Sequence, residues 1–227
     1  MSPGDRDFNR ELYPFLYTSA PETEVSLDHV FAAARTSTLA KCADVVALRR
    51  QLRDDFLDQI AEAGAAMSDR FLAGGKLLAF GNGGSATDAS DAAVDCLRPP
   101  VKAWRSLPAI PLSSDIGVVT GVANDVGFDN VFSRQIIALG ELQDIALGFT
   151  TSGSSPNVIA AFVEARKRGM LCIALVGYDG GELERSGLAD YCFVARLDYV
   201  PRIQEGHATV WHSLLDVAQL ALAKKAA

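Results

Sequence analysis

The sequence feature that most constrains the fold is a series of five short apolar segments that begins after Gly74-Gly75. Turns containing Gly, Ser or Asp, and stretches with helical patterning, separate these segments. Most of them are apolar on both sides, which is typical of parallel strands whose two faces are covered by helices. The predicted strands are Lys76–Phe80, Pro108–Leu112, Asp144–Phe149, Leu171–Val176 and Tyr191–Ala195.

Long helical patterns flank the strand-rich region. From Ser26 to about Leu72 apolar residues recur at helical spacing, with Gly64 as the only interior weak point, and this predicts one or two long amphipathic helices. A last long helix is predicted from about Pro201 to Lys224. The sequence therefore predicts an α/β fold: a three-layer α/β/α sandwich with a five-stranded parallel sheet, preceded by long N-terminal helices.

The length limits the number of domains. A chain of 227 residues is long enough for one full-sized domain but short for two independent ones. Residues 1–25 contain proline and follow no periodic pattern, so we interpret them as an irregular N-terminal arm. We predict a single domain over residues 26–227 that includes the N-terminal helices. In such a sheet, ligands bind at the carboxyl ends of the strands.

Composition and charge exclude several classes of protein. With 49% hydrophobic and 22% charged residues, the chain is of the globular type. Its 28 acidic and 21 basic residues give a net charge of -7, which disfavours DNA or RNA as a direct ligand. No apolar stretch approaches membrane-spanning length. The four cysteines form no CxxC pair and the N-terminus has no apolar signal segment, so we expect reduced thiols and a cytoplasmic location.

Two predicted strand-to-helix junctions have sequences suited to phosphate binding. The first, Gly81-Asn-Gly-Gly-Ser-Ala, lets backbone amides approach a ligand just before a helix N-terminus, although it is neither a GxGxxG motif nor a P-loop. The second has five hydroxyl residues in the six positions Thr150–Ser155, followed by Pro156 at the first position of a helix. Either loop alone is typical of a capped turn. Together, after two parallel strands, they favour a neutral phosphate cradle.

Three carboxylates lie at helical spacing after the first loop. Asp88, Asp91 and Asp95 share one face of the predicted helix, where like charges repel. If this face is buried, we expect a cation or an Arg beside it, or a raised pKa of one of the carboxylates. The alternative is an ordinary solvated polar face.

The last predicted helix contains two of the three histidines. His207 and His212 lie in the segment that begins at Arg202. A lone histidine is more often structural than catalytic, so this segment alone supports only a weak hypothesis of function.

Taken together, four motifs resemble those of the phosphoheptose isomerases of the sugar isomerase (SIS) domain superfamily. They are Gly81-Asn-Gly-Gly-Ser-Ala, Asn124-Asp125-x-Gly127-Phe128-x-x-Val131-Phe132-Ser-Arg-Gln, Thr151-Ser152-Gly-x-Ser155 and Arg202-Ile-Gln-Glu-x-His207. The resemblance covers roughly Ser26 to Lys224. It implies a SIS domain and a homotetramer with active sites between subunits. It also implies the conversion of sedoheptulose 7-phosphate to D-glycero-D-manno-heptose 7-phosphate through an enediol.

The resemblance also implies roles for individual residues. The residues implied to bind the phosphorylated sugar are Asn82, Gly83, Ser85, Asp125, Thr150, Thr151, Ser152, Ser155 and Gln204. The divalent metal of the family, usually zinc, would be held by Asp91, Asp95, Gln204 and His212. Asp95 would be the catalytic base and His212 the acid.

The implied metal site departs from the family pattern. Asp91 stands where the family has a His, and Asp95 stands where it has a Glu, so the base is one methylene shorter. Proton abstraction requires heavy atoms within about 3 Å, so the backbone or a water must compensate. Replacing an imidazole by a carboxylate makes the site less suited to zinc and better suited to magnesium, manganese or no metal.

These observations leave three hypotheses of function. The first is a phosphoheptose isomerase with Asp95 and His212 as its proton-transfer pair. The second, supported by the altered Asp91 and Asp95, is a phosphosugar-binding regulatory or adaptor protein that has lost catalysis. The third is an isomerase of another sugar phosphate, because pocket residues rather than the fold set specificity.

Overall fold

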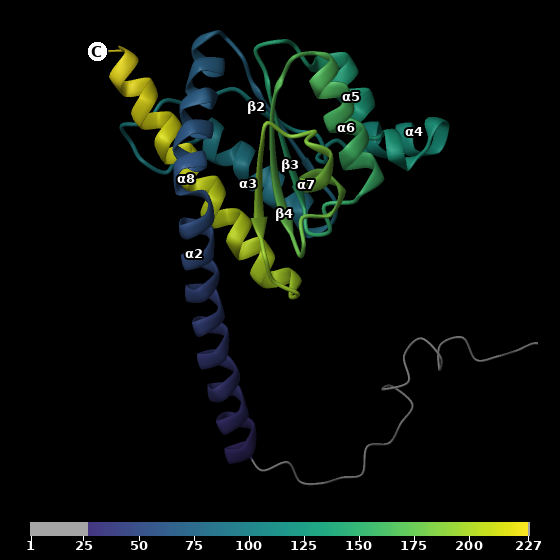
Figure 1. Cartoon of the computed structure of the whole chain (residues 1–227). Coiled ribbons are helices and arrows are strands. Elements are labelled where there is room, and N and C mark those ends of the chain that lie inside the picture. The colour runs from purple at the N-terminus through teal and green to yellow at the C-terminus, as the bar shows by residue number, and fades with distance from the viewer. Residues whose placement is uncertain (1–26, 227) are drawn as a thin grey trace, which may run out of the picture. The chain divides into compact units, whose positions relative to one another are not determined.

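The computed structural model describes residues 27–226, and helices and strands alternate through most of them (Figure 1). None of the helices in this range has an apolar stretch long enough to span a bilayer. The elements are α2 (Leu27–Leu72), β1 (Leu77–Gly81), α3 (Gly84–Leu97), β2 (Ala109–Pro111), α4 (Ile116–Val126), the 3-10 helix η2 (Phe128–Asn130), α5 (Ser133–Leu139), β3 (Ile145–Thr150), α6 (Pro156–Lys167), β4 (Leu171–Gly177), α7 (Gly181–Ser186), β5 (Tyr191–Ala195) and α8 (Val200–Ala226).

The chain divides into two compact units, residues 1–42 and residues 43–227. In the first unit, the described residues 27–42 form the beginning of α2. The second unit contains the sheet and the remaining helices. The predicted arm over residues 1–25 lies outside the described residues, and the single domain over 26–227 stays a prediction.

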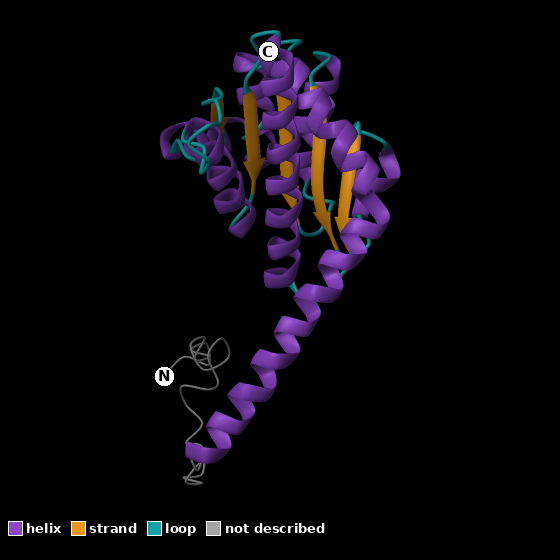
Figure 2. Ribbon diagram, turned by 90° about the vertical axis from the view of Figure 1, so that its left-hand side faces the viewer, coloured by secondary structure: helices purple, strands orange, loops and turns teal. Residues whose placement is uncertain are grey.

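The second unit is built on a five-stranded sheet in the order β2-β1-β3-β4-β5, with every neighbouring pair parallel. The arrows in Figure 2 accordingly run in one direction. This confirms the predicted α/β fold with its five-stranded parallel sheet. The predicted strands match closely, except that β2 is only three residues long. It is an edge strand that contains Pro111 and follows Pro108, and proline cannot donate a hydrogen bond to the sheet ladder.

Both faces of the sheet are buried, which explains the strands that are apolar on both sides. Along β1, Leu77 and Ala79 belong to one core cluster, while Leu78 and Phe80 belong to the other. The first cluster includes residues of α2, α3 and α8, and the second includes residues of α5, α6 and α7 (Figure 1). Alternating side chains of one strand thus enter different layers of the sandwich.

The N-terminal helical region is a single helix, and Gly64 does not interrupt it. A Cβ atom at Gly64 would lie 2.6 Å from the Cβ of Val217 on α8. The glycine therefore allows α2 and α8 to approach closely, and this packing outweighs its low helix propensity.

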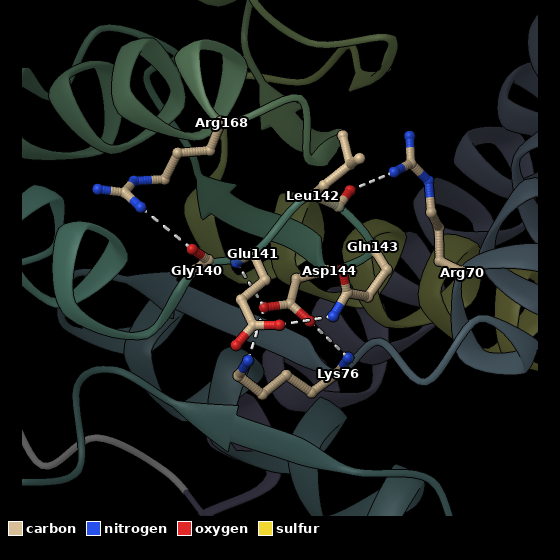
Figure 3. Close-up of polar contacts among 8 residues, drawn as sticks. All are labelled: Arg70, Lys76, Gly140, Glu141, Leu142, Gln143, Asp144 and Arg168. Atoms are coloured by element: carbon tan, nitrogen blue, oxygen red, sulfur yellow. Dashed lines mark hydrogen bonds and ion pairs between the residues drawn. The ribbon is translucent and has the colours of Figure 1, made fainter.

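At the amino edge of the sheet, the buried carboxylate of Asp144 links the segments that precede β1 and β3 (Figure 3). Asp144 is 1% exposed. Its Oδ1 accepts a hydrogen bond of 2.9 Å from the backbone N–H of Lys76. Its Oδ2 lies 2.6 Å from the Lys76 Nζ and accepts a 2.9 Å bond from the backbone N–H of Glu141. One side chain therefore fixes the start of β1 and the turn before β3.

Replacing Asp144 by Ala is expected to destabilise the protein by about 2–3 kcal/mol, because two backbone N–H groups and an ammonium lose a charged acceptor. Lys76→Met is the matched control. The Lys76 side chain is 24% exposed, so its loss should cost about 1 kcal/mol or less. Urea unfolding measures both values, and equal losses for the two variants would contradict the role given to the carboxylate.

Candidate active site at the carboxyl edge of the sheet

The sheet order changes direction between β1 and β3. The chain leaves β1 toward β2 on one side and later returns to place β3 on the other side of β1. Loops that follow two such strands lead away from each other, and ligands of open α/β sheets bind at this point. The two loops that the sequence predicts as a phosphate cradle follow these two strands, since β1 ends at Gly81 and β3 ends at Thr150.

The loop after β1 requires its glycines for close packing. A Cβ atom at Gly81 would lie 2.6 Å from the carbonyl oxygen of Ser85 and 2.8 Å from that of Phe149. Gly83 has a φ of 57°, which side chains rarely adopt, and it caps the N-terminus of α3. The glycine at position 81 therefore lets the loop pack closely against the backbone of α3 and β3.

The loop after β3 presents its hydroxyls at the N-terminus of α6. The Thr150 Oγ1 accepts a 3.2 Å bond from the backbone N–H of Gly153 and lies 3.3 Å from the Ser155 Oγ. Ser155 precedes Pro156, the first residue of α6, and makes no capping bond with its side chain. Thr150 is buried, Thr151 and Ser155 are half-buried, and Ser152 is exposed. This arrangement suits an anion, because hydroxyls and the positive end of a helix face it together.

The two loops are joined by a reciprocal pair of side-chain amides. Asn82 donates to the Oδ1 of Asn157 at 2.8 Å, and Asn157 donates to the Oδ1 of Asn82 at 2.9 Å. Asn157 is 2% exposed, so it has little access to water as an alternative partner. No role for Asn157 is predicted from the sequence. Its signal was a polar residue on the face of α6 that otherwise buries Val158, Ala161, Phe162 and Ala165.

The three carboxylates of α3 have three different surroundings. Asp88 is half-buried, and desolvation raises its pKa; a hydrogen bond from Gln204 opposes this shift and the charge of Asp91 adds to it. The Gln204 Nε2 donates to the Asp88 Oδ2 at 3.1 Å. Gly84 leaves room for this amide, since a Cβ there would lie 2.4 Å from the Gln204 Nε2. Asp91 is exposed, as on an ordinary solvated face.

The third carboxylate, Asp95, lies against α8. Its Oδ2 accepts a 2.9 Å hydrogen bond from the indole N–H of Trp211 and is 3.6 Å from the Nε2 of His212. The predicted base and acid are therefore neighbours. Trp211 is 2% exposed. Its contact with Asp95 could not be predicted, because the sequence of neither helix alone shows how α3 and α8 pack.

Of the four side chains that the resemblance implies as metal ligands, only two contact each other. Among them, Asp95 and His212 form a close pair, whereas Gln204 is bonded to Asp88 and Asp91 is exposed. Within residues 27–226 no group of three or more His, Cys, Asp or Glu side chains is arranged to hold a metal ion. The residues as placed thus do not fit the four-donor site of the family.

Asp125, predicted to line the pocket, lies on α4 and is exposed. It accepts a 2.8 Å hydrogen bond from the side chain of its neighbour Asn124. In the described part of the chain, no hydrogen bond or ion pair connects Asp125 with the other predicted substrate residues. Its role in the pocket stays a prediction.

The first turns of α8 bury polar groups beneath the site. Arg202, whose side chain is 11% exposed, forms an ion pair with Glu205. His207 is 1% exposed, and its ring lies 6.1 Å from the ring of Phe149, at the end of β3. Neither ring nitrogen makes a hydrogen bond of full geometry among the described residues. Burial lowers the pKa of His207 to about 4, and the backbone of Val176 opposes this shift only in part, so the imidazole is neutral at pH 7.

Comparison with known proteins identifies the class and then the family. A family model of the SIS domain matches residues 42–177, the region that holds both loops. The phosphoheptose isomerase of Pelobacter propionicus is 42% identical over 176 residues, 78% of this chain and 92% of that protein. That of Thermodesulfovibrio yellowstonii is 40% identical over 174 residues, 77% of this chain and 86% of that protein.

Two solved structures also match this chain. The phosphoheptose isomerase structure from Neisseria gonorrhoeae has a TM-score of 0.74 and 33% identity, and the one from Francisella tularensis has a TM-score of 0.76 and 31% identity. Each match covers 82% of this chain and 98% of the other. The chain belongs to the phosphoheptose isomerase family, which confirms the resemblance found in its motifs.

The buried His207 predicts a loss of stability in weak acid. Its pKa is about 4 in the folded chain and about 6.5 when unfolded, so below pH 6.5 the unfolded state binds more protons. The stabilisation is complete above pH 6.5 and falls as the pH approaches 4, by about 2 kcal/mol at pH 5. Urea unfolding at pH 7 and pH 5 measures it. His207→Leu should lack this component, and an unchanged pH dependence in that variant would contradict the assignment.

Proposed function

We propose that the protein isomerises sedoheptulose 7-phosphate to D-glycero-D-manno-heptose 7-phosphate. The observation that carries the proposal is the joining of the Gly-rich and hydroxyl-rich loops by Asn82 and Asn157, in a chain whose relatives are named phosphoheptose isomerases. This pairing supports a cradle for a phosphorylated ligand at the carboxyl ends of β1 and β3. The Asp95–His212 pair adds groups that can move protons.

In this proposal the cradle fixes the substrate by its phosphate. Hydroxyls and α6 backbone amides hold the dianion without a lysine or arginine, while Asn82, Gly83 and Ser85 contact the sugar. The residues proposed for the phosphate are Thr150, Thr151, Ser152 and Ser155. The proposal also retains Gln204 and Asp125 as contacts of the sugar.

The proposed chemistry needs one base and one acid. The Asp95 carboxylate removes a proton from C1 of the ketose, the C1–C2 double bond forms, and His212 gives a proton to the oxygen on C2. This produces the enediol. His212 then takes the proton from the oxygen on C1, and Asp95 returns its proton to C2 to complete the aldose. The Oδ2 to Nε2 distance of 3.6 Å supports these roles, because the groups can serve two adjacent atoms of one substrate.

Two further features belong to the proposal. A cytoplasmic location is supported by the four free cysteines, all within the described residues. A homotetramer is supported by large apolar side chains that are exposed in the single chain. These include Val94 at 57% and Leu97 at 53% on α3, and Leu220 at 67% on α8.

The competing hypothesis is a binding protein without catalysis. Its support is the change of the family's His and Glu to Asp91 and Asp95. Both hypotheses require the phosphate cradle, so binding of the sugar phosphate does not separate them. Turnover separates them.

Incubating the purified protein with sedoheptulose 7-phosphate should give the aldose, detected by chromatography and mass spectrometry. Asp95→Asn is expected to lower kcat by about 10²–10⁴ with little change in KM, because it removes the base. Ser152→Ala should raise KM about tenfold through a lost phosphate contact. Ser186→Ala, on α7, is the control and should behave like the wild type. If the wild type binds the ketose phosphate without converting it, the binding-protein hypothesis replaces this one.

The proposed assembly is tested by light scattering on the eluate of a sizing column. We expect a mass four times that of the 24.2 kDa chain. Replacing both Val94 and Leu97 by Ser should reduce this mass, because it removes apolar surface from an interface. A monomeric wild type at micromolar concentration would contradict the assembly.

A further inference from the structure

The feature that carries a further inference is the way in which Asp95 is held. One of its carboxylate oxygens accepts the indole N–H of Trp211 at 2.9 Å and also lies 3.6 Å from His212. The Asp95 side chain is 25% exposed, whereas that of His212 is 66% exposed. The carboxylate is thus oriented by a buried donor on one side and faces an accessible imidazole on the other.

The buried indole fixes the direction of the Asp95 carboxylate. Trp211 is 2% exposed and its N–H can only donate, so Asp95 is the acceptor that satisfies it. The indole bond uses one lone pair of one oxygen, so it sets the direction in which the other carboxylate oxygen points. Proton abstraction by the other oxygen of Asp95 leaves the indole bond in place.

Within residues 27–226, no hydrogen bond or ion pair links Gln204 or Asp91 to Asp95 or His212. The Gln204 amide is bonded to Asp88 and packs against Gly84, and Asp91 is exposed on α3. Catalytic zinc sites in proteins generally have three protein ligands. Here two donors, Asp95 and His212, come together, and one of them is shared with Trp211.

We infer that this chain performs its proton transfer without a resident divalent metal, with Trp211 as the positioning residue that orients the Asp95 carboxylate toward His212. The inference rests on the proposed isomerase function. Asp95 is one methylene shorter than the glutamate of the family, and the indole N–H fixes the direction of the shorter side chain. The carboxylate is stabilised by the indole N–H, which donates to it, and by the imidazole of His212, which lies 3.6 Å away.

The first test measures metal binding alone and needs no substrate. The full-length protein is incubated with excess ZnCl₂ or MnCl₂, passed through a sizing column and analysed for metal. We expect fewer than about 0.1 ions per chain, because two donors hold an ion only weakly. One zinc per chain, lost in His212→Asn, would overturn the inference.

The two tryptophans of the chain, Trp104 and Trp211, allow a spectroscopic version of this test. In Trp104→Phe the emission comes from Trp211 alone and reports its contact with Asp95. Adding ZnCl₂ should leave this emission unchanged. A saturable change at about one equivalent of zinc would mean that the ion reaches the carboxylate and would overturn the inference.

The second test addresses positioning. After treatment with EDTA, the wild type should retain its full rate, and Trp211→Phe should show a kcat reduced about ten- to hundredfold with an unchanged KM. Trp104→Phe is the matched control and should keep the kcat of the wild type. An unchanged kcat in Trp211→Phe, or activity that EDTA abolishes and zinc restores, would overturn the inference.

The outcomes separate this inference from the proposed function. Zinc uptake with turnover overturns the metal-free site and leaves the isomerase intact. A wild type that neither takes up zinc nor converts the substrate overturns the isomerase, and with it the role of Trp211. If Trp211→Phe fails to fold, metal content and Trp211 emission still decide the question.

Discussion

Two hydrogen bonds between the side-chain amides of Asn82 and Asn157 hold together the loops on which the rest of the site depends. They cross the point where the chain leaves β1 in one direction and β3 in the other. Without them, the glycine loop and the hydroxyl loop would be two separate turns. With them, two helix N-termini and a set of hydroxyls lie together at the carboxyl edge of the sheet. A neutral pair of amides also suits a site for a phosphate dianion, because it adds no charge of its own.

The residues proposed for proton transfer lie where α3 packs against α8. Gly84 gives the Gln204 amide room to reach Asp88, and Trp211 reaches Asp95 at the opposite end of α3. The same helix packing places Asp95 beside His212 and Gln204 beside Asp88.

Much of the fold could be predicted from the sequence, because parallel strands buried on both faces have an unmistakable apolar pattern. Prolines in an edge strand shortened β2, and tertiary packing made Gly64 part of a continuous helix. The two loops were also predictable, since their glycines and hydroxyls follow strands directly. The partners of Asn157 and Trp211 were not, because each depends on a residue at least 75 positions away in the chain. Such contacts follow from the layers of the fold and not from any local pattern.

The most direct test of this account is a crystal structure of the Asp95→Asn variant with sedoheptulose 7-phosphate. The account predicts the phosphate between the Gly81–Ala86 and Thr150–Asn157 loops, with the side chain at position 95 within about 3 Å of C1 or C2 of the sugar. Trp211 should still contact that side chain. A sugar phosphate bound away from these loops, or with its reacting carbons remote from position 95 and His212, would contradict the account.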